Sequence, residues 1–388
     1  MIADEGSLAP IEMHHVPDLA IARHAHLVGI AGAGMRALAE VLLGRGWQLS
    51  GSDPSIDAVQ YLATRNVRLH DHHAADNLPA DCAVVVHSDA IGEDNPELVR
   101  AAERGIPRHS YFQVLGQLMS TGTGLAVAGT HGKSTTTAMA AQMLVQAGLD
   151  PTVLCGATPL GQPSGGRAGR SDLMVAEACE YNRNFLNLGP RHAVILGIEP
   201  DHFDCYDSLS DLEDAFARFA RRVPPGGLIL AAADCPVTRR VVADVPSRVE
   251  TFGLDGQADW LAHGLSSDLG KYRFEIRRLG RPVCEVSLPV PGRHNVLNAL
   301  AAAALAWHNG VAGEQIARSL ADLPGLKRRF ETLASGREIL MIDDYAHHPT
   351  EVVATLQAVR QVAPQRRVWC VFQPHQASRT ERLLDELA

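Results

Sequence analysis

The sequence contains no uninterrupted apolar run of the roughly 18 to 20 residues that a membrane-spanning helix requires. The N-terminal segment also lacks the basic start and apolar stretch of a secretory signal, because four acidic residues are spread along it: Asp4, Glu5, Glu12 and Asp18. We therefore expect a cytoplasmic protein with no part inserted in a membrane.

Paired cysteines and an excess of positive charge are absent as well. The 7 cysteines stand singly between Cys82 and Cys370, without a C-x-x-C pair, which argues against a disulfide framework or a zinc ribbon. The formal net charge of -9 argues against a nucleic-acid partner, since proteins that bind nucleic acids usually carry a basic surface. With 388 residues, 46% of them hydrophobic, the chain is long enough for two or three cores and suits small-molecule chemistry.

The first third of the chain alternates short apolar runs with helical patterns, which is typical of βαβ units on a parallel sheet. The expected strands are 26–30, 48–53 and 83–87, and the expected helices are 35–45 and 96–104. A glycine-rich turn between the first strand and helix, Gly29 to Gly34, suits a phosphate at a helix N-terminus. Asp53 ends the second expected strand, at the sequence spacing where such folds often place a ribose contact. Ala31, however, replaces the middle glycine of the motif. Taken alone, this motif leaves open a diphosphate site or a turn without ligand.

A second α/β segment begins at Leu125, and a third follows Pro324. In the second we expect strands at 125–129, 172–178, 192–198 and 228–234, further strands within 260–288, and helices at 133–148, 209–222 and 291–308. In the third we expect strands at 338–344 and 367–372, a helix at 349–362 and a last helix up to Ala388. Because the third segment has room for only two or three βα units, we expect its domain to continue beyond the last residue.

The stretch Gly129-THGKS-Ser134 has the composition of a phosphate loop. Backbone N–H groups, the Lys133 ammonium and the Ser134 hydroxyl suit phosphate oxygens, β/γ charge and Mg²⁺ respectively. The common spacing G-x-x-x-x-G-K-[ST] would place glycine where Val127 stands, so a glycine-rich helix start with an exposed lysine stays possible. Glu177 and the pair Asp201-His202 follow the next two strands, at the edge where open α/β sheets bind ligands.

Seven ordered motifs resemble the Mur ligase family of ATP-dependent ligases of bacterial cell-wall synthesis, and most of all its alanine-adding members. They are GTHGKST, EACEYNRNF, GIEPDHFD, GRHNVLNALAA, KRRFE, DDYAHHPTE and FQPHQASRT, and the resemblance runs from about His26 to the last residue. In that family the shorter loop is normal, so Val127 is no objection. The resemblance implies three α/β domains: Rossmann-like 1–122, a P-loop ATPase-like central domain 123–322, and a truncated Rossmann-like domain 323–388.

The resemblance also implies roles for individual residues. ATP would contact the loop residues Gly129, Thr130, His131, Gly132, Lys133, Ser134 and Thr135, together with Asn295, Asn298 and Arg329. Mg²⁺ would be held by Ser134, Glu177 and His202. Catalysis would rest on Lys133, Glu177, His202, Arg329, Asp344, His348 and Arg379. UDP-N-acetylmuramate and L-alanine would contact Gly29, Gly32, Gly34, Asp53, Ser88, His348 and Arg379.

The implied reaction is the addition of L-alanine to UDP-N-acetylmuramate through an acyl phosphate. Two alternatives stay open: a murein-peptide recycling ligase that joins a tripeptide to the same sugar, and a truncated nucleotide-binding relic. The motifs GAGM and HFDCY favour the alanine-adding function.

Four residues depart from the family pattern. Ala31 weakens the expected grip on the diphosphate, while Cys179, Tyr181 and Asn182 border the acceptor region and leave the amino-acid preference open. The pairs His14-His15 and His72-His73 are interpreted as surface residues, because no third metal ligand stands at a suitable spacing. Cys205 is interpreted as a packed thiol.

Overall fold

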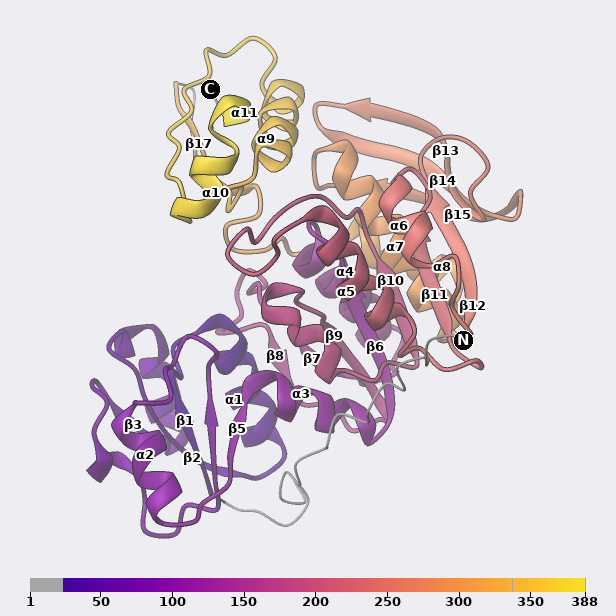
Figure 1. The fold of residues 1–388 in the computed structure, drawn as a ribbon. Helices are drawn as coiled ribbons and strands as arrows, with labels where there is room; N and C mark the ends of the chain where they lie inside the picture. The colour runs from indigo at the N-terminus through magenta and orange to yellow at the C-terminus, as the bar shows by residue number, and fades with distance from the viewer. Residues whose placement is uncertain (1–23, 337, 388) are drawn as a thin grey trace.

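A computed structural model describes residues 24–336 and 338–387, which form three sheets with helices packed around them (Figure 1). The N-terminal part lies at one end of the molecule, the residues after 330 lie at another, and the central sheet lies between them. Within the described residues, no helix is long and apolar enough to cross a membrane.

The N-terminal sheet has five parallel strands in the order β3-β2-β1-β4-β5, so the Rossmann-like βαβ prediction is confirmed. Its strands are β1 His24–Val28, β2 Gln48–Ser52, β3 Arg68–His70, β4 Val84–His87 and β5 Arg108–Ser110. Its helices are α1 Ala33–Gly44, α2 Pro96–Glu103 and α3 Tyr111–Ser120, with 3₁₀ turns η1 Ile56–Arg65 and η2 Ala75–Asn77.

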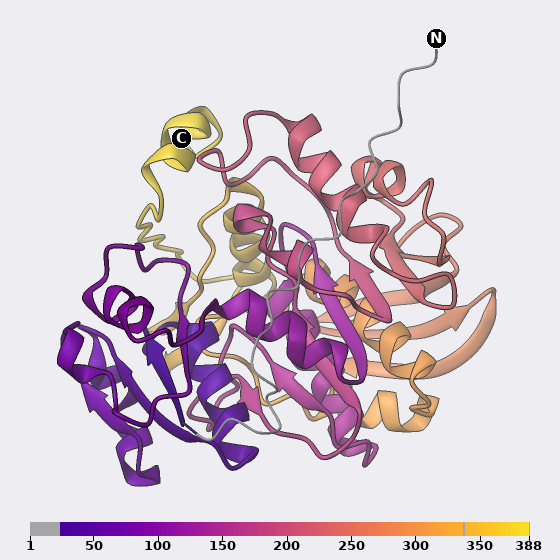
Figure 2. The same cartoon turned by 60° about the horizontal axis from the view of Figure 1, so that its bottom comes forward.

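The central sheet has ten strands in the order β15-β14-β13-β12-β11-β10-β6-β9-β7-β8. These strands are β6 Thr123–Ala128, β7 Thr152–Leu154, β8 Gly166–Arg167, β9 Leu173–Glu177, β10 His192–Ile195, β11 Leu228–Ala232, β12 Arg248–Gly253, β13 Trp260–Asp268, β14 Lys271–Arg278 and β15 Arg281–Leu288. The last three strands are antiparallel and lie on the side of the molecule away from β1–β5 (Figure 2). The prediction of strands within 260–288 is therefore confirmed.

The helices of the central part are α4 Lys133–Gln146, α5 Leu209–Ala220, α6 Pro236–Val241, α7 Arg293–His308 and α8 Gly313–Ala321, with the 3₁₀ segment η3 Tyr181–Asn187. The alanine-rich helix α7 is buried along most of its length in the same core as α4. Because alanine side chains are short, α7 lies close to the phosphate-loop helix, and its Asn298 meets the loop itself. The alanine-rich sequence of α7 thus brings Asn295 and Asn298 beside the phosphate loop.

The C-terminal part has the strands β16 Glu331–Ser335 and β17 Leu340–Asp343, and the helices α9 Pro349–Val362, α10 Ala377–Arg382 and α11 Leu384–Leu387. The strand expected at 367–372 was wrong: these residues have no strand conformation, and Val371 is 98% exposed. An apolar run forms a strand only when a neighbouring strand accepts its hydrogen bonds, and the described sheet here pairs β16 with β17 alone.

One histidine was wrongly interpreted as a surface residue. His73 is half-buried, and its Nδ1 lies 2.9 Å from Ser52 Oγ and 3.2 Å from the buried Glu97 carboxylate. His72 is exposed as expected, whereas His14 and His15 lie outside the described residues. The Glu97 network helps to hold β2 against α2.

Candidate active site

The loop between β6 and α4 has a backbone that requires glycine at two positions. Gly129 and Gly132 have φ angles of 132° and 79°. A Cβ atom at Gly132 would lie 2.4 Å from Asn298 Oδ1, and one at Gly129 would lie 2.6 Å from Leu196 Cβ. Thr130 fastens the loop to the chain after β10, because its N–H donates to Gly197 O at 2.9 Å. These two glycines and this hydrogen bond together determine the shape of the loop.

Lys133 points into the centre of this loop. Its Nζ donates to Gly129 O at 2.6 Å, to Thr130 O at 3.1 Å and to Glu180 Oε1 at 2.8 Å. Burial alone would lower the pKa of Lys133, but the Glu180 carboxylate outweighs it and raises this pKa. The side chain therefore presents a permanent positive charge, as phosphate binding requires. Sequence reasoning missed Glu180, although it is the second acid of the motif EACE.

The three predicted Mg²⁺ ligands fall into a contacting pair and a more distant histidine. Ser134 Oγ donates to Glu177 Oε2 at 3.0 Å, and the other Glu177 oxygen accepts the Gly156 N–H. His202 Nε2 instead lies 3.3 Å from Glu180 Oε1, the oxygen that also accepts from Lys133 Nζ. Hydroxyl and carboxylate oxygens are ligands that Mg²⁺ prefers, so Ser134 and Glu177 fit this ion.

A cavity of about 310 Å³ opens beside the loop. Among its lining residues are members of the predicted ATP site, namely His131, Gly132, Thr135, Asn295, Asn298 and Arg329, together with the predicted catalytic residue Asp344. Asn298 Nδ2 donates to Asn295 Oδ1 at 3.2 Å, so the two amides of α7 act as one polar edge. Met139, Leu326 and other apolar side chains form the walls. An apolar cavity with an amide edge fits a nucleoside base.

The C-terminal part contributes Arg329 and Asp344 to the rim of this cavity. The Arg329 guanidinium lies over the Tyr345 ring, 5.5 Å from its centroid. Asp344 accepts the N–H groups of Phe330 at 2.7 Å and Ala346 at 2.8 Å, which shapes the chain on both sides of β17. Burial raises the pKa of Asp344.

His348 and Arg379 are both buried and both contact the chain after β10. His348 Nε2 lies 3.2 Å from Pro200 O, and Arg379 Nε donates to Asp201 Oδ1 at 2.7 Å. Asp201, which follows a strand at the edge where such sheets bind ligands, forms an ion pair with Arg379. His348 and Arg379 are each 3% exposed. Because both contact the chain after β10, they lie at the junction of the central and C-terminal parts.

The predicted sugar-nucleotide residues gather at the carboxyl edge of the N-terminal sheet, apart from the cavity. The Gly29 turn, with φ 80°, follows β1, and a Cβ there would lie 3.1 Å from Ser88 Cβ. Gly34 lies against the Tyr111 ring, which would be 3.0 Å from an added Cβ. Asp53 uses one oxygen to accept the Ala31 N–H at 3.0 Å and the other to accept Ser55 N–H at 2.8 Å. Gly32 begins α1.

Three of the four departures from the family pattern, Cys179, Tyr181 and Asn182, lie at and just before the start of η3. The Tyr181 ring lies 5.2 Å from the His202 ring, and its hydroxyl donates to Asp204 at 3.1 Å. Asn182 has a left-handed φ of 51° and contacts the half-buried Cys205 thiol. Burial raises the pKa of Cys179 to about 12, so this residue adds no charge where the family pattern has an acid.

Comparisons with known proteins agree along the described chain. Residues 127–306 match the Mur ligase middle domain, residues 24–123 match the Mur ligase family catalytic domain, and residues 328–388 match the Mur ligase glutamate ligase domain. The UDP-N-acetylmuramate–L-alanine ligase of Salinibacter ruber is 40% identical over 379 residues, which are 97% of this chain and 80% of that protein. The enzyme of the same name from Desulfitobacterium hafniense is 42% identical over 370 residues, 94% of this chain and 81% of that protein.

Solved structures give the same picture. The UDP-N-acetylmuramate-alanine ligase of Thermotoga maritima has a TM-score of 0.80 at 30% identity and covers 93% of this chain and 83% of its own. A murein peptide ligase of Psychrobacter arcticus has a TM-score of 0.77 at 27% identity and covers 91% of this chain and 79% of its own. By its sequence relatives, its domain matches and its fold, this chain belongs to the Mur ligase family.

Proposed function

We propose that this chain is an ATP-dependent ligase that adds L-alanine to the lactyl carboxylate of UDP-N-acetylmuramate in peptidoglycan precursor synthesis. One observation carries the proposal: the phosphate loop, the Asn295–Asn298 pair of α7, and Arg329 with Asp344 of the C-terminal part surround a single cavity. The relatives at about 40% identity, both named UDP-N-acetylmuramate–L-alanine ligase, support this substrate pair over a tripeptide. The cytoplasmic location stays a prediction.

The reaction proceeds in two displacements. A lactyl carboxylate oxygen attacks the γ-phosphorus of ATP and ADP leaves, which gives an acyl phosphate. The alanine nitrogen then attacks the acyl carbon, loses a proton and expels inorganic phosphate. Such steps need charge neutralised on the phosphoryl group and the reactants held in line, more than covalent help from the protein.

The residues of the chain divide these tasks. Lys133 lies where the β- and γ-phosphate oxygens would enter the loop, and Glu180 holds its ammonium in place. Asn295 and Asn298 present amide groups to the base edge. Ser134 and Glu177 would hold Mg²⁺, which supplies further positive charge to the phosphates.

His348 and Arg379 would orient the carboxylates of the substrates from the C-terminal part. Gly29, Gly32, Gly34, Asp53 and Ser88 would receive the uridine diphosphate at the edge of the N-terminal sheet.

A phosphate-release assay tests the proposal. The full chain is supplied with ATP, Mg²⁺ and UDP-N-acetylmuramate, together with L-alanine, L-serine, glycine or the tripeptide. We expect turnover with L-alanine. Lys133→Ala should abolish it, whereas Lys271→Ala should preserve it, because Lys271 is exposed and has no expected role in the reaction. Turnover with the tripeptide alone would instead establish the recycling reaction, and nucleotide binding without turnover would establish the relic.

A further inference from the structure

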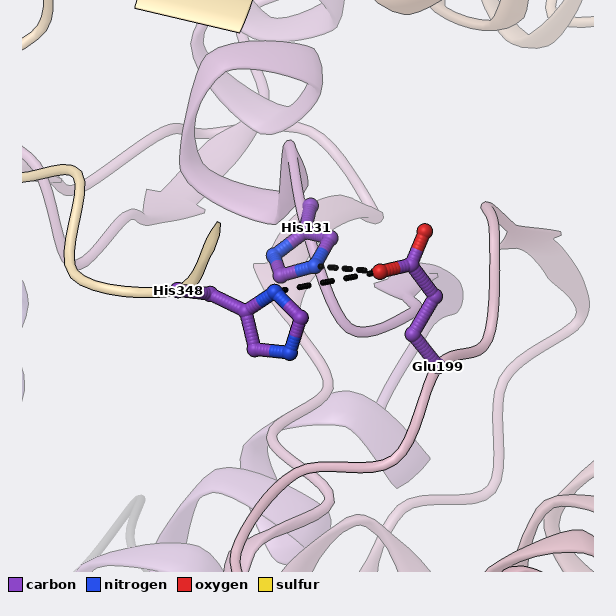
Figure 3. A group of neighbouring side chains, drawn as sticks. All are labelled: His131, Glu199 and His348. Carbon is purple, nitrogen blue, oxygen red and sulfur yellow. Dashed lines mark ion pairs between the residues drawn. The ribbon is translucent and has the colours of Figure 1, made fainter. Parts of the chain in front are cut away.

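Two histidines and a glutamate from three separate segments meet beside the phosphate loop (Figure 3). His131 belongs to the loop itself, Glu199 follows β10, and His348 precedes α9. His131 Nε2 lies 3.4 Å from Glu199 Oε2, and His348 Nδ1 lies 3.8 Å from the same oxygen. One candidate ligand atom from each residue lies within 4.8 Å of the other two.

The second nitrogen of His131 is already held in the manner of a metal-binding histidine. Its Nδ1 lies 3.0 Å from Glu351 Oε1, while its buried Nε2 has no hydrogen-bond partner among the described residues. Metal-ligating histidines usually donate their remote N–H to a carboxylate or a carbonyl, which orients the ring and increases its basicity. Glu351 therefore stands where a supporting carboxylate belongs.

His348 is supported in the same way by a backbone carbonyl. Its Nε2 lies 3.2 Å from Pro200 O, an arrangement that places the proton on Nε2 and leaves the Nδ1 lone pair toward Glu199. The Thr350 N–H lies 3.3 Å from Nδ1, a long contact that a cation would replace. Thr350 also donates its hydroxyl to Glu199 Oε2 at 2.6 Å, which fixes the carboxylate.

We propose that His131, Glu199 and His348 bind a transition-metal cation of the Zn²⁺ class, with one coordination position left open. Ligand atoms roughly 2.0–2.2 Å from a tetrahedral zinc ion lie about 3.3–3.6 Å from one another, so small side-chain movements close the site. Two imidazoles and one carboxylate form a set that suits zinc, whereas Mg²⁺ prefers oxygen ligands. The site is thus chemically distinct from the Ser134–Glu177 pair.

A proton on His131 competes with a metal ion for this site. Burial would lower the pKa of His131, but the nearby Glu199 and Glu351 carboxylates outweigh it and raise this pKa to about 9. Zn²⁺ binding therefore releases a proton, and the two carboxylates balance the charge of the ion. A bound ion would tie the phosphate loop to the start of α9.

Titration of the full chain with Zn²⁺ in the absence of nucleotide tests the site, and its outcome does not depend on ligase activity. We expect one equivalent to bind, with affinity at least about 100-fold weaker in His131→Ala, His348→Ala and Glu199→Gln. Glu351→Gln should weaken binding by about 10- to 100-fold without abolishing it, since Glu351 supports a ligand. His72→Ala is the matched control, because His72 is exposed beside Asp71, and it should bind as the wild type does.

Absorption of the Co²⁺-loaded wild-type chain gives a second readout that needs no variant. A four-coordinate spectrum without thiolate charge-transfer bands supports the nitrogen and oxygen ligand set. Six-coordinate Co²⁺, thiolate bands from any of the cysteines, absence of stoichiometric Zn²⁺ binding, or unchanged affinity in the three ligand variants would each overturn the proposal.

Discussion

The charge on His131 should fasten the phosphate loop to α9, and this contact should weaken at alkaline pH. His131 lies 3.0 Å from Glu351 and 3.4 Å from Glu199. Because these carboxylates outweigh the effect of burial, the pKa of His131 is about 9, above its ordinary 6.5. A pKa that is higher in the folded state gives stability that is complete below about pH 6.5 and is lost as the pH rises through about 9.

The two carboxylates of this contact contribute a pH dependence of stability that is opposite to that of His131. The ion-pair contact with His131 lowers the pKa of Glu199 to about 2, and although burial acts to raise the pKa of Glu351, contact with His131 lowers it strongly. The contribution of these carboxylates is present above about pH 4.5 and is lost as the pH falls through their folded values. The contact should therefore be strongest between about pH 5 and 6.5.

The magnitude follows from the pKa difference. A rise from 6.5 to about 9 corresponds to at most ~3.4 kcal/mol at about 1.4 kcal/mol per pKa unit. Because the side chain is 21% exposed and solvent screens part of the attraction, we expect about 1–2 kcal/mol. A difference of this size moves the midpoint of thermal unfolding by roughly 2–8 °C in a domain of this size class.

Calorimetric melting of the metal-free protein and of His131→Gln, from pH 5 to 10 with a chelator, measures this difference. Titrations of groups that His131 does not affect are shared by both proteins and largely cancel in the comparison. The gap between the two midpoints should be largest near pH 6 and should close by about pH 10, while His72→Gln should show no gap. A gap of constant size from pH 6 to 10 would refute the role assigned to the His131 charge.

Three further substitutions test the site and its scaffold. Gly132→Ala should weaken ATP binding at least about tenfold in a titration, because its φ of 79° costs a side chain about 1–2 kcal/mol and the added Cβ would meet Asn298. Glu180→Gln should destabilise the chain by about 3 kcal/mol in denaturant unfolding and slow phosphate release, because Lys133 loses its buried carboxylate; unchanged turnover would contradict this. Glu250→Gln should cost a similar ~3 kcal/mol while leaving the KM values unchanged, since this buried carboxylate serves only the scaffold. Its donors are Trp260 Nε1, Arg278 Nη2 and His308 Nε2.

The sequence predicts most helices and strands because their signals are local. The periodicity and the Pro349 start of α9 are contained in its own residues, and the helix runs from Pro349 to Val362 as expected. The run 367–372 is even more apolar than α9, yet it forms no strand, because a strand depends on hydrogen bonds to another segment. Local pattern therefore determines helices more securely than it determines strands.

The sequence predicted the parts of the site that lie within single motifs, but not the contacts between distant segments. The loop, Glu177 and the Asn295–Asn298 pair each follow from spacing within one motif, and the structure places them around the cavity and the loop. The contact between Asp201 and Arg379 joins residues 178 positions apart, and that between His131 and Glu351 joins residues 220 apart. No spacing rule within one motif reports such a pair.

Three motif acids to which the resemblance gave no role have one property in common: each contacts a cation that the resemblance had assigned to ligands. Glu180 holds Lys133, Asp201 holds Arg379, and Glu351 holds His131. A buried cation needs a carboxylate partner to keep its charge, because an isolated buried charge is too costly to retain. Each of these acids also stands in one of the seven motifs, beside a residue that was recognised. The motifs contain four further unassigned acids, Glu199, Asp204, Glu331 and Asp343, so only the structure shows which acid contacts which cation.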